Sequence, residues 1–147
     1  MNNTNTKEEN EMKNLHNRIY SDIQPSQKDV MALIKKWGYL AKFGDGQVEI
    51  YPKGKRGLCS YFASDKQDAV RTAREEAIAA FRANLEATGL EVWQRDALAS
   101  WFARMGIQWR DALYNAWFTG NYQGSAVSSE LQALRNSRDG YRLIAAI

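Results

Sequence analysis

The chain has 147 residues, of which 44% are hydrophobic and 25% charged, as in an ordinary globular protein of one domain or two small ones. No apolar run approaches the ~20 residues that cross a bilayer, and the polar stretch from Met1 to Met12 lacks the apolar centre of a secretory signal. We therefore expect a cytoplasmic protein without a membrane anchor.

The net charge of +3 is unevenly distributed along the chain. Residues 25–64 hold 7 basic and 3 acidic side chains, whereas the segments on either side are close to neutral. A local excess of positive charge favours contact with a polyanion such as nucleic acid.

Three regions follow from composition. Residues 1–24 are rich in Asn, Thr, Lys and Glu and are expected to form a flexible polar tail. Residues 25–89 are expected to form an α-β-β-β-α domain, and residues 90–147 a helical C-terminal subdomain that is rich in tryptophan and packs on that domain.

The first helix is predicted over residues 26–37, with Ser26 as its N-cap and Gly38 as its end. Its apolar stripe consists of Val30, Leu33, Ile34 and Trp37. Three strands are predicted next, over residues 39–43, 47–51 and 58–62. Because the turns between them are short, the strands should be antiparallel neighbours.

A long helix is predicted over residues 65–88, with Ser64 as cap, Gln67 completing a capping box and Gly89 just past its end. Its apolar stripe consists of Val70, Ala73, Ala77, Phe81 and Leu85. A three-stranded sheet has one face to bury, and this helix is the expected cover. The predicted fold class is therefore α+β.

The C-terminal third has helical periodicity. Helices are predicted over residues 91–105 and 107–118, followed by a loop over 120–124 and a short helix from Ser128 to near Gly140. The stretch from Tyr141 to Ile147 is expected to dock as a terminal strand or extended tail. Four tryptophans recur every eight residues, at Trp93, Trp101, Trp109 and Trp117. Most should lie in the core, with one or two exposed.

Catalysis has little support in the sequence. A single cysteine (Cys59) and a single histidine (His16) provide neither a disulfide, nor a Cys/His zinc site, nor a Ser–His–Asp triad. Glu75 and Glu76 are adjacent on a helix and therefore point in different directions. We expect no catalytic residue, no metal and no cofactor.

Residues 38–88 carry a resemblance to known DNA-binding domains. The strands are followed by the basic turn Gly54-Lys55-Arg56-Gly57, the aromatic pair Tyr61-Phe62, and then Ser64, Ala69 and Ala73-Arg74. This pattern resembles the three-stranded domains of plant ethylene-response factors and of the arm-binding ends of tyrosine recombinases. The resemblance implies a sheet that lies in the major groove of DNA, and an accessory protein of a phage or plasmid.

The chain also departs from these families. Glu49 would lie on one face of the sheet, and the strands hold few arginines for reading bases. The α-β-β-β-α order is similar to that of the double-stranded RNA-binding domain. That domain carries a basic cluster at the start of its last helix, whereas here Lys66 is offset by Asp65 and Asp68.

Two binding functions remain open. The first is nucleic-acid binding, in which phosphates are contacted by Lys36, Lys42, Lys53, Lys55 and Arg56. The same basic turn is also typical of a solvated hairpin tip that protects an edge strand from aggregation. The second function is a protein–protein module, an inhibitor or adaptor, with exposed aromatic anchors at Trp117, Phe118 and Tyr122. Exposed aromatics would also suit base stacking.

Overall fold

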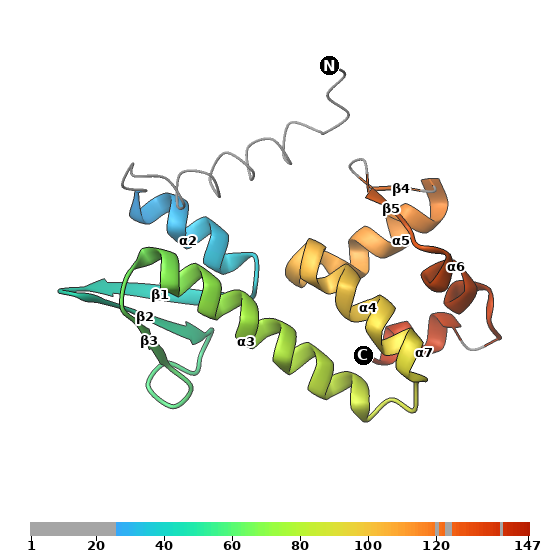
Figure 1. Cartoon of the computed structure of the whole chain (residues 1–147), viewed down its shortest axis with the longest axis horizontal. Coiled ribbons are helices and arrows are strands. Elements are labelled where there is room, and N and C mark those ends of the chain that lie inside the picture. The colour runs from blue at the N-terminus through green and yellow to red at the C-terminus, as the bar shows by residue number, and fades with distance from the viewer. Residues whose placement is uncertain (1–25, 120, 123–124, 139) are drawn as a thin grey trace, which may run out of the picture. The chain divides into compact units, whose positions relative to one another are not determined.

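The computed structural model describes residues 26–119, 121–122, 125–138 and 140–147. These residues form two compact units that divide between residues 77 and 78, so the helix α3 (Lys66–Glu86) contributes to both. The predicted α+β class is confirmed by a three-stranded antiparallel sheet, a long helix and a helical C-terminal segment (Figure 1). The predicted tail of residues 1–24 lies outside the described residues.

The first described element of the first unit is α2 (Gln27–Lys35), which confirms the predicted helix. The Ser26 Oγ accepts a hydrogen bond from the Asp29 backbone N–H at 3.1 Å, so the expected N-cap is present. The helix buries Val30, Leu33 and Ile34. This face is the predicted apolar stripe.

The sheet consists of β1 (Tyr39–Gly44), β2 (Gln47–Pro52) and β3 (Tyr61–Ala63), paired antiparallel in the order β1-β2-β3. The third strand begins three residues later than predicted and ends one residue later, because residues 58–60 belong to the β2–β3 loop. Gly57 has a positive φ of 88° and its N–H donates to the Ser60 Oγ at 2.8 Å, so the chain turns there instead of extending. Leu58 is consequently 92% exposed.

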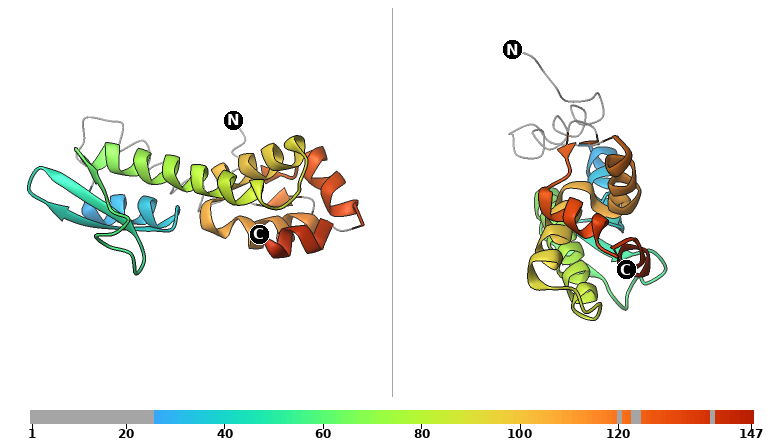
Figure 2. Two further views of the ribbon diagram at one scale, coloured as in Figure 1. Left: turned by 90° about the horizontal axis from the view of Figure 1, so that it is seen from below. Right: turned by 90° about the vertical axis from the view of Figure 1, so that its right-hand side faces the viewer.

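One face of the sheet is buried, and we call it the inner face. Its strand positions include Ala41, Val48, Ile50 and Ala63. The buried stripes of α2 and of the first turns of α3 supply the apolar partners. The Arg74 guanidinium of α3 lies 5.5 Å from the centroid of the Trp37 ring, just past α2, so the two helices are neighbours. In Figure 1 and in the left-hand view of Figure 2, α2 and the first turns of α3 lie next to the strands.

The cap of α3 differs from the prediction. Asp65, rather than Ser64, accepts the Asp68 N–H, at 2.8 Å, and the Asp68 carboxylate accepts the Ser64 N–H at 3.0 Å. A carboxylate is the stronger acceptor and also interacts favourably with the positive end of the helix dipole. These contacts lower the pKa of Asp68, with the Ser64 backbone N–H as the largest cause.

The second unit is built mainly from helices. Beyond the C-terminal part of α3, its described elements are α4 (Val92–Met105), η1 (Gly106–Gln108), α5 (Trp109–Thr119), β4 (Asn121–Tyr122), β5 (Ser125–Ala126), α6 (Ser129–Asn136) and α7 (Gly140–Ala146). The predicted helices of this region are confirmed. Part of the predicted loop instead pairs as the short β4–β5 hairpin, while Gly120, Gln123 and Gly124 lie outside the described residues.

Aromatic rings form the core of the second unit. Phe81 stacks on Phe102 with ring centroids 4.3 Å apart and meets the Trp109 ring at 5.1 Å and a steep angle. The buried Trp101 indole donates its Nε1–H to the Trp109 carbonyl at 2.9 Å. Three of the four regularly spaced tryptophans are therefore core residues, and Trp93 is the exposed one at 42%.

The last segment is a helix, so the predicted terminal strand or tail is wrong. Residues 140–146 form α7, with Ile144 fully buried. Arg142, Leu143 and Ala145 favour helix, and a helix satisfies its own backbone hydrogen bonds without needing a neighbouring strand. Within the part of the chain that the structure describes, no helix has the length and hydropathy of a membrane span.

Candidate nucleic-acid interface

The sheet has a second face, which points away from α2 and α3. We call it the outer face, and it consists of Leu40, Lys42, Glu49, Tyr51 and Phe62. The register places Lys42, Glu49 and Phe62 in one row across the three strands, with Leu40 and Tyr51 in the next row. Phe62 is 62% exposed and Lys42 is exposed, so this row is open to solvent.

A hydrogen-bonded cluster occupies the middle of the outer face. Arg56 donates to the Glu49 Oε1 through its Nε at 3.1 Å and its Nη2 at 3.0 Å, and the Ser60 Oγ donates to the Glu49 Oε2 at 2.7 Å. These bonds lower the pKa of Glu49, with Arg56 as the largest cause and Ser60 next. The Arg56 guanidinium also lies 5.7 Å from the centroid of the Tyr51 ring.

The ion pair changes the charge that the face presents. The Glu49 side chain is only 14% exposed, whereas that of Arg56 remains 46% exposed. Since Glu49 and Arg56 cancel one another, the positive charge here comes from Lys42, Lys53 and Lys55. All three are exposed.

The β2–β3 loop holds two of these lysines, Lys53 and Lys55, together with Arg56. Its conformation is fixed by turns, because the Lys55 N–H donates to the Pro52 carbonyl at 3.0 Å and the Cys59 N–H to the Lys55 carbonyl at 3.1 Å. Because Arg56 of this loop pairs with Glu49, the loop that carries Lys53 and Lys55 adjoins the outer face.

Lys36 does not join the other four predicted phosphate contacts. It forms the C-cap of α2, and its ammonium lies 5.1 Å from the centroid of the Trp37 ring. Burial chiefly, and then the charge of Arg74, lower the pKa of Lys36. Since Trp37 is buried beside Arg74 of α3, Lys36 belongs to the helix layer and not to the outer face.

The three predicted aromatic anchors do not share one surface environment. Trp117 shares a helix face with Leu113, four residues earlier, and is 4% exposed, so it is a core residue and not a surface anchor. Phe118 is the next residue, turned by about a third of a circle, and is 83% exposed. Tyr122 lies in β4, opposite Ser125.

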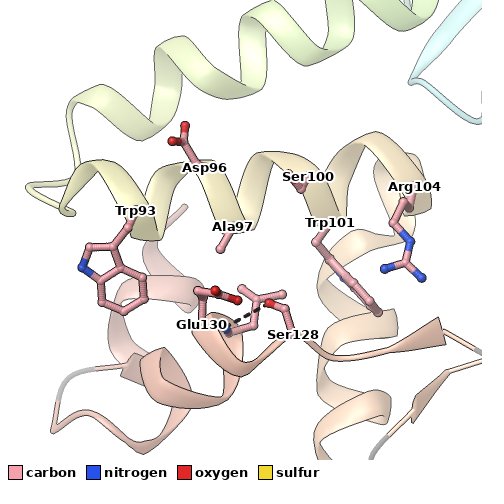
Figure 3. A pocket seen from close by; sticks show the side chains of 9 residues that line it. Trp93, Asp96, Ala97, Ser100, Trp101, Arg104, Ser128 and Glu130 are labelled. Atoms are coloured by element: carbon pink, nitrogen blue, oxygen red, sulfur yellow. Dashed lines mark hydrogen bonds between the residues drawn. The ribbon is translucent and has the colours of Figure 1, made fainter.

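The second unit contains a groove of about 380 Å³ between α4 and the start of α6 (Figure 3). The lining residues are Trp93, Asp96, Ala97, Ser100, Trp101, Arg104, Ser128, Glu130 and Leu131. Its polar groups are largely engaged in structure. Asp96 pairs with Arg82 at 3.1 Å, and the Ser128 Oγ accepts the Leu131 N–H at 3.3 Å as the cap of α6 (dashed in Figure 3).

Sequence reasoning missed this groove and the exposure of Phe62 on the outer face. Trp93, Ala97 and Arg104 recur at helical spacing on one face of α4, and this stripe is the signal that indicates the groove. For Phe62 the signal is strand alternation, because its neighbour Ala63 is buried on the inner face.

Within the described residues, no group of three or more His, Cys, Asp or Glu side chains is placed to hold a metal ion. Comparison of the chain with protein families, with curated proteins and with solved structures gives no significant match.

Proposed function

We propose that this protein is a nucleic-acid-binding protein that uses the outer face of its sheet and the adjoining β2–β3 loop. One observation supports this proposal above all. The outer face is open and has basic side chains around it, and its one carboxylate, Glu49, is already paired with Arg56. Lys42 lies beside Glu49 in the register, and Lys53 and Lys55 extend the positive region along the loop. Lysines in such an arrangement neutralise phosphates and release their counterions.

Salt dependence is the direct test of this proposal. Binding of a fluorescent oligonucleotide is measured by anisotropy from low to moderate salt, because each neutralised phosphate steepens the fall of affinity with salt. The double variant Lys53→Gln/Lys55→Gln should weaken binding and make the slope of log K against log [salt] about 1.5 less negative, at 0.7–0.9 per charge.

The matched control is Lys28→Gln/Lys35→Gln, which removes the same charge from exposed positions of α2. It should leave the slope nearly unchanged. Equal losses of affinity in both double variants would mean that net charge alone drives the interaction. An affinity that does not change with salt would also contradict the proposal.

A second candidate function is protein binding through the second unit. It is favoured by one observation, the 83% exposure of Phe118 at the end of α5. A large exposed ring is a typical anchor at protein interfaces. A partner whose capture is lost with Phe118→Ala and retained with Phe62→Ala would support this function; equal capture by both variants would contradict it.

A further inference from the structure

The outer face offers few groups that read the edges of paired bases. Direct readout of a duplex needs donors and acceptors that point into a groove. Both carboxylate oxygens of Glu49 already accept hydrogen bonds, and Arg56 directs two of its nitrogens to Glu49. Of the strand residues on this face, Lys42 alone carries a cationic donor.

The same face offers an exposed aromatic surface instead. Phe62 is 62% exposed on the edge strand β3, and the Tyr51 ring lies in the neighbouring row on the central strand β2. An aromatic ring on a sheet can stack on the flat face of an unpaired base, and all four bases present such a face. Bases inside a duplex do not present that face.

We infer that the outer face binds single-stranded nucleic acid, with an unpaired base stacked on Phe62 and neighbouring phosphates held by Lys42, Lys53 and Lys55. This inference rests on the proposed function and names its substrate class. Lys42 and Phe62 lie on the two outer strands of one row, roughly 10 Å apart across two strand spacings. A base over Phe62 and a phosphate at Lys42 therefore belong to one stretch of a few nucleotides.

The experiment compares single-stranded with double-stranded probes. Fluorescent 15-nucleotide DNA and RNA strands of one mixed sequence, and the same strands annealed to their complements, are titrated with the full chain at several salt concentrations, and the probes are compared at equal salt. We expect at least one of the single strands to bind about 10-fold more tightly than its duplex, as stacking of one base predicts.

Variants at Phe62 separate stacking from apolar contact. Phe62→Leu keeps much of the apolar area but removes the ring, and should weaken single-strand binding about 10-fold while leaving the salt slope unchanged. Phe62→Tyr retains the ring and should bind like the parent. The matched control is Phe118→Leu, at an exposed phenylalanine of the other unit, which should have no effect.

The outcomes distinguish this inference from the proposed function. Tighter binding of the duplexes, or single-strand binding that Phe62→Leu leaves unchanged, overturns the inference while the proposed function stands. Absence of salt-dependent binding to all four probes overturns both. Because Phe62 is largely exposed, each variant should retain the circular dichroism spectrum and thermal midpoint of the parent.

Discussion

Glu49 has two roles on the outer face. It lowers the positive charge there, and it also holds the β2–β3 loop in place through Arg56 and Ser60. Because Ser60 in turn accepts the Gly57 N–H, one carboxylate links the central strand to the turn that precedes β3. The loop that carries Lys53 and Lys55 therefore depends on Glu49 for its conformation.

The pKa of Glu49 gives this link a pH dependence. Because the Arg56 and Ser60 hydrogen bonds lower the pKa below the ordinary 4.5, the stabilisation is fully present above about pH 4.5 and is lost as pH falls towards the lowered value. In urea unfolding at several pH values, the parent should exceed Glu49→Gln in stability at pH 7, and this difference should shrink towards pH 3. A difference that stays constant over that range would contradict the role of the carboxylate.

Trp101 and Trp93 differ in burial although they stand on the same helix. Trp101 is buried and donates to the Trp109 carbonyl, so Trp101→Phe should lower the free energy of unfolding by about 2–3 kcal/mol through a lost hydrogen bond and a cavity. Trp93→Phe, at a 42% exposed position, should cost less than about 1 kcal/mol. Urea unfolding followed by circular dichroism measures both, and similar losses would contradict this distinction.

At the scale of elements, the sequence predicts the helices and strands whose caps, apolar stripes or alternation are visible within a few residues. The cap at Ser26 and the apolar stripe predict α2, strand-like composition predicts β1, and polar–apolar alternation predicts β2. Residues 58–60 resemble a strand in composition, but the positive φ of Gly57 and the Ser60 hydrogen bonds keep them in the loop. A mostly apolar stretch of seven residues, interrupted only by Arg142, fits strand or helix equally well, so periodicity could not identify α7.

The candidate site was predictable in composition but not in detail. The basic loop and Lys42 follow from residue type and turn spacing. The pairing of Arg56 with Glu49 does not, because it depends on side-chain rotamers across a seven-residue separation. The placement of Lys36 in the helix layer depends equally on tertiary packing, because it follows from the contact of the neighbouring Trp37 with Arg74 of α3.

The junction of α6 and α7 shows what a glycine contributes to packing. Gly140 was expected near the end of a helix, yet it begins α7, and its N–H donates to the Ser137 carbonyl at 3.2 Å. A Cβ at Gly140 would overlap the Leu134 carbonyl oxygen at the end of α6, so the backbone there would have to shift.

Gly140→Ala should therefore destabilise the chain by about 1–3 kcal/mol, the usual cost of overpacking. Gly44→Ala is the matched control, because a Cβ there makes only an ordinary contact of 3.8 Å with the Gln47 carbonyl oxygen. Thermal unfolding of the two variants, side by side with the parent, tests this expectation. It fails if Gly140→Ala melts at the midpoint of the parent.

At the scale of the whole molecule, α3 is the element that both units need. Its first turns bury Ala69, Val70 and Ala73 in the first unit, whereas Phe81 and Leu85 belong to the second. The division at residues 77 and 78 falls within this helix. The domain boundary expected near Gly89 stays a prediction, and it assigns the whole of α3 to the first domain.

The two boundaries make different predictions for fragments of the chain. A fragment of residues 90–147 lacks Phe81, which stacks on Phe102 and Trp109, and also lacks the fully buried Leu85. Losing two such side chains costs about 5–10 kcal/mol, comparable to the entire stability of a small domain. We therefore expect residues 78–147 to unfold cooperatively in a circular dichroism melt and residues 90–147 to show no cooperative transition. If both fragments melt cooperatively at one midpoint, Phe81 and Leu85 are not needed by the second unit, and Gly89 is the better boundary.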